Sequence, residues 1–170
     1  MIREATPADV PTILSLIHQL ADYERAADEV KATEQQLHTA LFGADAVASC
    51  LLAVDDAGHD AGVDPQAHHA VVGFALWFRS FSTWLGTAGI YLEDLFVSPD
   101  ARGGGHGRAL LTALAAIAVE RGYGRVEWSV LNWNEPAKGF YRRLGARPQD
   151  EWTVWRLTGD ALEELGRARQ

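Results

Sequence analysis

The sequence predicts a single α/β domain spanning residues 1–170, and three observations lead to that expectation. Between residues 90 and 133, a strand-like run, a helical run and a second strand-like run follow one another, as in a βαβ unit with parallel strands. Residues 47–54 and 70–79 form two further strand-like runs that are placed to pair as an antiparallel hairpin. The 170 residues are 48% hydrophobic and 22% charged, which is typical of one globular domain with a substantial core.

The N-terminal third is predicted to hold one strand and two helices. Residues 2–5 have the pattern of a short strand. Residues 6–9, Thr-Pro-Ala-Asp, combine a capping threonine, a proline at the first helical position and an acid three residues after the cap. Apolar residues then recur at helical spacing to about residue 25. Residues 33–36 repeat the capping pattern and open a shorter helix that Gly43 ends.

The C-terminal half is predicted to alternate strands and helices. The βαβ unit consists of strands at residues 90–97 and 125–133 around a helix at 108–121. Asn134 can cap a further helix that reaches about Leu144. The other expectations are a loop at 55–69, a loop at 80–89 that carries Trp84, a last strand at 152–158, a terminal helix at 159–170, and tryptophans that lie mostly in the core.

Charge and cysteine content narrow the expected class of partner and the compartment. Fifteen Lys and Arg against 23 Asp and Glu give a formal net charge of −8, which disfavours nucleic acid and anionic lipid and favours cationic molecules. Cys50 is the only cysteine, and the first four residues carry charge where a signal peptide would become apolar, so a cytoplasmic location is expected. The six histidines are scattered without a zinc spacing, so we expect no metal.

The most informative stretch is the glycine-rich turn at residues 102–108, Arg-Gly-Gly-Gly-His-Gly-Arg. Glycines allow tight turning and present successive N–H groups, and these donors lie where a helix begins, so the turn predicts a phosphate site. Arg102 and Arg108 would flank it. A dinucleotide fingerprint would need glycine at position 108, and a triphosphate loop would need Gly-Lys-Ser/Thr, which is absent. A flexible loop without a ligand is the remaining alternative.

The pattern Arg102-x-x-Gly105-x-Gly107 resembles the pyrophosphate loop of the GNAT acetyltransferases, and the likeness extends from Arg3 to about Asp160. Within that superfamily the sequence is similar to the diamine acetyltransferases of the spermidine/spermine, thialysine and ornithine kinds. The resemblance implies the GNAT fold, a mixed and mostly antiparallel sheet with helices on both faces, parted where two parallel strands diverge. It is carried by residues 3–9, 21–24 (Ala-Asp-Tyr-Glu), 91–97 (Tyr-Leu-Glu-Asp-Leu-Phe-Val), 102–108, 133–136 (Trp-Asn-Glu-Pro), 140–141 (Phe-Tyr) and 151–162.

The resemblance implies acetyl-coenzyme A as the cosubstrate. Asn134 would hydrogen-bond the pantetheine arm, although a plain helix cap is the alternative for this residue. The backbone of three strand residues would contact the same arm, and the glycine-rich turn would hold the pyrophosphate; within it, His106 can instead point at solvent. The arm-binding residues are Leu95, Phe96 and Val97, and the pyrophosphate-binding residues are Arg102, Gly103, Gly104, Gly105, His106, Gly107 and Arg108.

The implied chemistry is direct attack of a neutral amine on the thioester, without an acyl-enzyme. An alkyl ammonium has a pKa of about 10.4, so removing its proton at pH 7 costs about 4.6 kcal/mol and a base is useful. The resemblance assigns that role to Glu93, directly or through water, and protonation of the leaving thiolate to Tyr141. From the residues alone, the favoured interpretations are a salt-bridged strand carboxylate for Glu93 and a tyrosine at the edge of the core for Tyr141.

The acceptor site is expected to bind a cation. Asn132 stands where the spermidine/spermine enzymes carry a glutamate, and Glu151 lies upstream of Trp152, displaced from their acidic pair; both favour a short diamine or basic amino acid over spermine. Trp84 could cover an apolar part of the acceptor, and the family implies a homodimer. Alternatives are acetylation of protein N-termini or lysines, and a non-catalytic acyl-coenzyme A sensor. The expected acceptor-binding residues are Tyr23, Glu24, Glu93, Asp94, Asn132 and Glu151.

Overall fold

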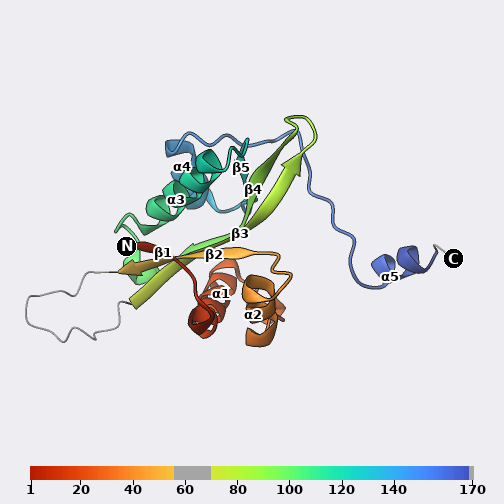
Figure 1. The fold of residues 1–170 in the computed structure, drawn as a ribbon, viewed down its shortest axis with the longest axis horizontal. Helices are drawn as coiled ribbons and strands as arrows, with labels where there is room; N and C mark the ends of the chain where they lie inside the picture. Colours follow the sequence, from red (N-terminus) through yellow and green to blue (C-terminus); the bar gives the residue numbers. More distant parts are fainter. Residues whose placement is uncertain (56–69, 169–170) are drawn as a thin grey trace, which may run out of the picture. The chain divides into compact units, whose positions relative to one another are not determined.

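The computed structural model describes residues 1–55 and 70–168, in two compact units, Met1–Ser129 and Val130–Gln170 (Figure 1). Each unit is described by itself below. The loop predicted at residues 55–69 lies, apart from Asp55, outside the described residues.

The first unit is built on a five-stranded sheet in the order β1-β2-β3-β4-β5 (Figure 1). Neighbouring strands from β1 to β4 are antiparallel, whereas β4 and β5 are parallel, with Ile90 opposite Val126. The predicted hairpin and parallel pair are therefore confirmed, as is the mixed, mostly antiparallel sheet. The strands are β1 (Ile2–Glu4), β2 (Ser49–Asp55), β3 (Ala70–Ser82), β4 (Thr87–Val97) and β5 (Val126–Glu127).

Three helices cover the sheet of this unit, α1 (Val10–Glu24) and α2 (Glu34–Phe42) on one face and α3 (His106–Glu120) on the other (Figure 1). The predicted start signals operate as expected. Asp9 accepts hydrogen bonds from the backbone N–H and the hydroxyl of Thr6, at 2.8 and 2.7 Å. The hydroxyl of Thr33 accepts from the backbone N–H of Gln36 at 3.3 Å. These bonds satisfy donors that a helix start leaves without a partner.

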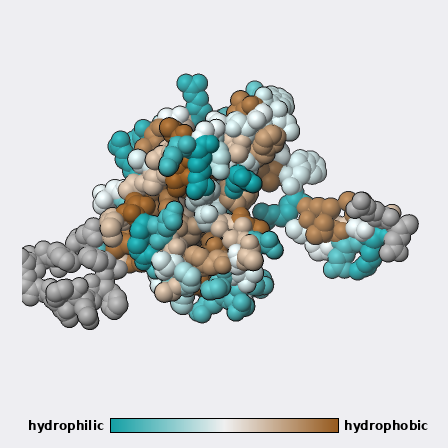
Figure 2. Space-filling model, viewed as in Figure 1, coloured by the Kyte–Doolittle hydropathy of each residue, from teal (hydrophilic) through white to brown (hydrophobic). Residues whose placement is uncertain are grey.

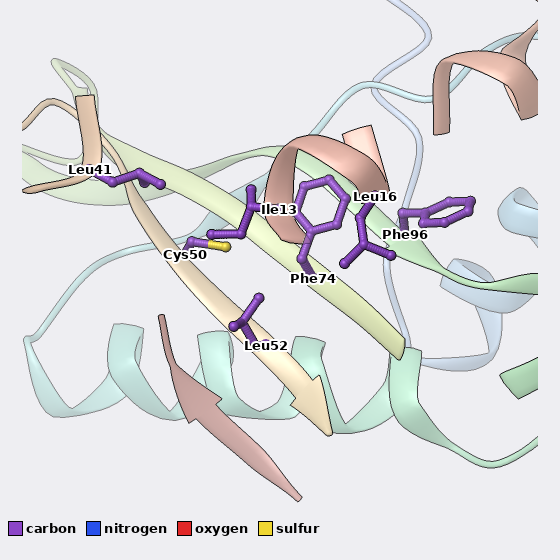
Figure 3. Packing of buried hydrophobic residues seen from close by; sticks show 7 residues of the cluster. All are labelled: Ile13, Leu16, Leu41, Cys50, Leu52, Phe74 and Phe96. Atoms are coloured by element: carbon purple, nitrogen blue, oxygen red, sulfur yellow. The ribbon is translucent and has the colours of Figure 1, made fainter. Parts of the chain in front are cut away.

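The core between the sheet and α1 is a cluster of seven buried side chains that α1, α2 and strands β2, β3 and β4 contribute (Figure 3). Phe74 and Phe96 are opposite each other in the register of β3 and β4. Their burial anchors the middle of the sheet against α1 and so fixes the position of the strand segment that follows. The cluster consists of Ile13, Leu16, Leu41, Cys50, Leu52, Phe74 and Phe96.

The second unit contains α4 (Glu135–Arg143) and α5 (Gly159–Arg167). Asn134 caps α4 as predicted, since its Oδ1 accepts a hydrogen bond of 3.2 Å from the N–H of Ala137. Hydrophobic and hydrophilic residues lie side by side on α5 (Figure 2). The predicted strand at 152–158 is wrong, because these residues form no strand. Alternating β-formers give a strand only where a partner strand completes the ladder, and in the described part of the chain no strand pairs with these residues.

Two further expectations about strands need correction. The strand predicted at 125–133 is reduced to Val126–Glu127, since pairing with β4 stops there. The loop predicted at 80–89 is a tight turn: β3 runs to Ser82, β4 begins at Thr87, and Gly86 turns the chain with a φ of 65°. The serines and glycines near this turn are not typical of strands, so the sequence did not indicate that the strands extend this far. Pairing between β3 and β4 supports the strand conformation here.

The tryptophans are not mostly core residues as predicted. Trp77 is buried, whereas four others are exposed. Trp84 sits at the tip of the β3–β4 hairpin, beyond the cover of any helix, and two more lie in the segment without a strand. The exposed tryptophans are Trp84, Trp133, Trp152 and Trp155.

Candidate active site

A β-bulge at Glu93 shapes the centre of the first unit. Leu76 of β3 pairs with Asp94, but the next residue, Trp77, pairs with Leu92, so Glu93 is an extra residue in β4. A bulge bends its strand and increases the local twist. The pairing of β4 with β5 comprises Ile90 and Tyr91 and ends just before this residue. Glu93 therefore marks the point from which β4 no longer follows β5.

Beyond the bulge, one edge of β4 is available for a ligand. Leu95, Phe96 and Val97 pair with β3 on their other side, while the β5 pairing ends at Tyr91. Peptide N–H and C=O groups on an open strand edge require hydrogen-bond partners, and an extended ligand that carries amides can supply them. Phe96 is buried and the other two are half-buried, so the segment is held firmly by the core. The three predicted arm-binding residues thus lie together on this edge.

The glycine-rich turn joins β4 to α3 and has the backbone of an anion site. Gly103 and Gly105 have φ angles of 89° and 82°, in the left-handed region that residues with a Cβ adopt only under strain. Gly105 is also the N-cap of the fifteen-residue helix α3, whose first-turn N–H groups have no partner within the helix. A Cβ on Gly104 would lie 3.0 Å from Nε2 of His106. Glycine is therefore required at this turn for backbone reasons, and the positive end of a helix dipole points into it.

Arg102 links the glycine-rich turn to the end of α1, a contact that the sequence analysis did not predict. Its Nε donates a hydrogen bond of 3.1 Å to the carbonyl of Val97. Its guanidinium lies 4.6 Å from the ring centroid of Tyr23 and 5.9 Å from that of Phe96, within the range of cation–π attraction. Tyr23 thereby lies next to the predicted pyrophosphate loop. No local sequence signal relates residues so far apart in the chain. Arg108 is exposed in the first turn of α3.

Three carboxyl groups near the bulge interact electrostatically. Glu24 is the last residue of α1, and Glu93 and Asp94 are adjacent in β4. Burial raises the pKa of Asp94 to about 6, and the negative charges of Glu93 and Glu24 contribute to the rise. Burial also raises the pKa of Glu24. A concentration of negative charge that raises carboxyl pKa values in this way is stabilised when a cation binds.

The remaining predicted site residues belong to the second unit. Asn134 is buried at the start of α4, and Tyr141 is half-buried on the same helix, with its ring centroid 5.3 Å from that of Phe140. The carbonyl of Asn132 accepts a hydrogen bond from Lys138. Glu151 is exposed between α4 and α5. The catalytic and binding roles expected for these residues stay predictions.

The buried thiol of Cys50 is unsuited to covalent catalysis. It lies in the core cluster, and burial, followed by the charges of Asp9 and Asp94, raises its pKa to about 12. A thiol of such pKa is almost entirely protonated at neutral pH and is a poor nucleophile. This agrees with the expected direct transfer of the acetyl group.

The described residues contain neither a group of side chains that could hold a metal ion nor a membrane-spanning helix. In the described part of the chain, no three His, Cys, Asp or Glu side chains are close enough together to hold a metal ion. Of the six histidines in the sequence, His59, His68 and His69 lie outside the described residues. Among the helices of residues 1–55 and 70–168, none has the length and apolarity needed to cross a membrane.

Comparisons with known proteins agree with this geometry. Residues 15–146 match the family described as the acetyltransferase (GNAT) family. The sequence is 39% identical over 168 residues to a thialysine N-epsilon-acetyltransferase of Bos taurus, covering 97% of this chain and 96% of that protein. It is 38% identical over 197 residues to an L-ornithine N5-acetyltransferase of Arabidopsis thaliana, covering 96% and 86%.

A solved structure supports the fold over the whole chain. An integron cassette protein from the mobile metagenome of V. cholerae matches with a TM-score of 0.76 and 27% identity, covering 98% of this chain and 97% of that one. The family match includes the bulged strand, the glycine-rich turn and α4. The chain belongs to the GNAT family of acetyltransferases.

Proposed function

We propose that this enzyme transfers the acetyl group of acetyl-coenzyme A to a primary amine of a short diamine or a basic amino acid. The observation that carries the proposal is the group formed by Glu24, Glu93 and Asp94 at the point where β4 stops pairing with β5. A cationic acceptor held by these carboxylates would lie beside the strand edge that is open to the cosubstrate. The names of the bovine and Arabidopsis relatives, which denote acetylation of thialysine and ornithine, support an acceptor of this class.

The residues present suit acetyl-coenzyme A. The left-handed glycines and the free N–H groups at the start of α3 suit a diphosphate, and the open edge at Leu95–Val97 suits the amides of pantetheine. Arg102, Arg108 and Asn134 are proposed to add contacts. The thioester supplies an activated acetyl group, and the protein must supply an amine without its extra proton.

Two side chains are proposed to move protons. Glu93, exposed on the bulge and beside Asp94, would accept the proton of the acceptor ammonium, directly or through water. Tyr141 would donate a proton to the leaving thiolate, because a phenol and a thiol have comparable pKa values. Tyr23 and Glu24 would line the acceptor, and Asn132 and Glu151 would contribute from the second unit.

A thiol-release assay tests the proposal. The purified protein is incubated with acetyl-coenzyme A and with diaminopropane, putrescine, spermidine, ornithine, lysine or thialysine, and free thiol is followed against an amine-free control. We expect turnover with several of the short acceptors. Release with none of them would contradict the small-amine proposal. Turnover of peptides alone would then favour a protein acetyltransferase, and tight cofactor binding without any turnover would favour a sensor.

Two variants separate the proposed roles. Tyr141→Phe and Glu93→Gln should each lower kcat by 10²-fold or more, the scale of a lost general acid or base, while the affinity for acetyl-coenzyme A changes little. Equal losses of turnover and cofactor affinity in Tyr141→Phe would give that residue a structural role instead.

We further propose that the two compact units form one domain that acts as a cytoplasmic homodimer. The family match extends across the boundary at Ser129, which supports one domain. Apolar side chains in the C-terminal segment are exposed and could be covered by a second copy. Light scattering of the purified protein tests the dimer, and a monomer at micromolar concentration would contradict it. These side chains are Trp152, Val154, Trp155, Leu157, Leu162 and Leu165.

A further inference from the structure

A pair of stacked aromatic rings lies on the sheet face that carries Asp94. Phe78 of β3 and Tyr91 of β4 are opposite each other in register, with ring centroids 5.1 Å apart and an interplanar angle of 28°. Side chains alternate along β3, so Phe78 shares a face with Leu76, the partner of Asp94. The bulge at Glu93 brings Tyr91 to this face as well. We call Phe78 and Tyr91 the aromatic shelf.

The aromatic shelf is partly exposed although its surroundings are packed. Leu76 packs against the core cluster under α1, but Phe78, two residues further along β3, is 36% exposed. The exposure of stacked aromatic rings to water is unfavourable unless another apolar group covers them. In the described part of the chain α1 ends at Glu24, which is one of the carboxylates that raise the pKa of Asp94. The shelf therefore continues the surface on which the three carboxylates lie.

A hydrogen bond fixes the shelf at the point where the parallel strands part. The hydroxyl of Tyr91 and the hydroxyl of Ser129 lie 3.0 Å apart. Tyr91 is the last β4 residue that pairs with β5, its partner is Glu127, and Ser129 follows two residues later. This bond joins the segments that contain β4 and β5 just beyond the last pair of their ladder. It therefore orients the Tyr91 ring at the entrance to the open strand edge.

The spacing of the shelf and the carboxylates suits a short aliphatic chain. Phe78 lies two positions beyond Leu76 in β3, which corresponds to about 7 Å along the strand. A molecule that places an ammonium group among the carboxylates would extend several methylene groups over the rings. Each methylene removed from water by such contact strengthens binding by up to about fourfold.

Building on the proposed function, we propose that the aromatic shelf of Phe78 and Tyr91 is the subsite for the methylene chain of the acceptor, and that Ser129 is a positioning residue for it. In such acceptors, the aliphatic chain that separates the reacting amine from the second cationic group would lie over the two rings. The ring faces also attract ammonium groups, which adds to this preference.

The test measures KM and kcat for α,ω-diamines with two to six carbons, in the wild type and in four variants. Phe78→Ala should raise the KM of the four- to six-carbon diamines about 5- to 20-fold and flatten its dependence on chain length, with kcat and the KM of acetyl-coenzyme A changed less than twofold. Phe78→Leu, which keeps an apolar side chain, should recover part of the loss. Phe81→Ala is the matched control, because Phe81 is 65% exposed on the opposite face of the same strand.

The positioning role of Ser129 has its own readout. Tyr91→Phe and Ser129→Ala remove the same hydrogen bond, so each should raise the diamine KM about two- to fivefold, and the double variant should show no further increase. Additive effects of the two changes would contradict the positioning role. Melting temperatures of all variants verify that each is folded.

The outcomes separate this inference from the proposed function. If the wild type acetylates diamines but Phe78→Ala retains the wild-type chain-length dependence, as Phe81→Ala should, the shelf is not the chain subsite and the inference fails alone. If the wild type releases thiol with no amine, the proposed function fails and the inference fails with it.

Discussion

Replacement of Asp94 by asparagine should make the protein more stable at neutral pH while weakening its binding of the acceptor. The folded protein holds the pKa of Asp94 at about 6, chiefly through burial and secondarily through the charges of Glu93 and Glu24, against 3.8 for an ordinary aspartate. A carboxyl whose pKa is raised by folding binds protons more tightly in the folded state. Its ionisation therefore destabilises the fold as the pH rises above the ordinary value.

The magnitude follows from the two pKa values. Each pH unit between them corresponds to 1.36 kcal/mol, so an ionised Asp94 lowers the free energy of unfolding by about 3 kcal/mol at pH 7.5. At pH 4.0 the Asp94 carboxyl is protonated in the folded state and partly protonated in the unfolded state. Its effect on the free energy of unfolding then falls below about 1 kcal/mol. Asp94→Asn should remove this effect, and the gain at pH 7.5 corresponds to a rise in Tm of about 6–12 °C.

Urea denaturation followed by circular dichroism, at pH 7.5 and pH 4.0, measures the effect. The matched control is Asp45→Asn, because Asp45 is exposed and should change the free energy of unfolding by less than about 0.5 kcal/mol at either pH. The same gain at both pH values, or none at pH 7.5, would refute the reasoning. In the assay of activity, Asp94→Asn should raise the KM of the amine about tenfold, the scale of one lost charge interaction at a partly solvated site.

Two further changes test other parts of the first unit. Gly105→Ala should lower the free energy of unfolding by about 1–2 kcal/mol and weaken acetyl-coenzyme A binding in calorimetry. The reason is its φ of 82°, which strains any residue with a Cβ even though no atom lies within 4 Å of that position. Gly166→Ala is the control, because Gly166 is also in open space but has no positive φ, and it should have neither effect. Asp9→Asn should destabilise the protein by about 2–3 kcal/mol at pH 7, since Arg3 donates two hydrogen bonds of 2.7 Å to this carboxylate. Those bonds hold the pKa of Asp9 well below its usual range, so the loss should shrink as the pH falls below about 4, and an equal loss at pH 3 and pH 7 would contradict this account.

Local signals in the sequence predicted the helices. The strands were predicted less well, because they depend on pairing between residues that are far apart in the sequence. The capping patterns at Thr6 and Thr33 act between residues three apart, and the structure confirms the helices that follow them. The glycine-rich turn is similarly local, because its function depends on consecutive backbone conformations. The segment at 152–158 has the composition of a strand, but no strand among residues 1–55 and 70–168 pairs with it, and composition alone cannot supply one.

The candidate site was predictable as a set of residues and not as an arrangement. The resemblance selected Glu24, Glu93 and Asp94, yet nothing in the sequence indicates that Glu93 is the extra residue of a bulge, since register depends on how two strands meet. The aromatic shelf was missed for the same reason. Phe78 lies in a run that alternates regularly, and only the shift of register places Tyr91 against it.

Two changes at position 93 test the carboxylate of Glu93 and the bulge separately. A substitution removes the charge and keeps the extra residue, whereas a deletion removes both. Glu93→Ala should lower kcat and leave acetyl-coenzyme A binding intact, since the extra residue and the open edge of β4 remain. Deletion of Glu93 should restore a regular ladder between β3 and β4, in which Leu92 stays opposite Trp77 and Tyr91 stays opposite Phe78. Without the bulge, β4 should no longer diverge from β5, and cofactor binding should be lost together with turnover.

Titration calorimetry and circular dichroism on the two variants distinguish these effects. A folded deletion variant that binds acetyl-coenzyme A as tightly as Glu93→Ala would show that the bulge is not what opens the edge of β4. If the deletion variant does not fold, inserting a second residue after Glu93 offers the converse change, because it lengthens the bulge while the residues on either side keep their partners in β3. Loss of binding in that variant, with α3 and the glycine-rich turn unaltered in sequence, would show that cofactor binding depends on the geometry of the bulge in β4.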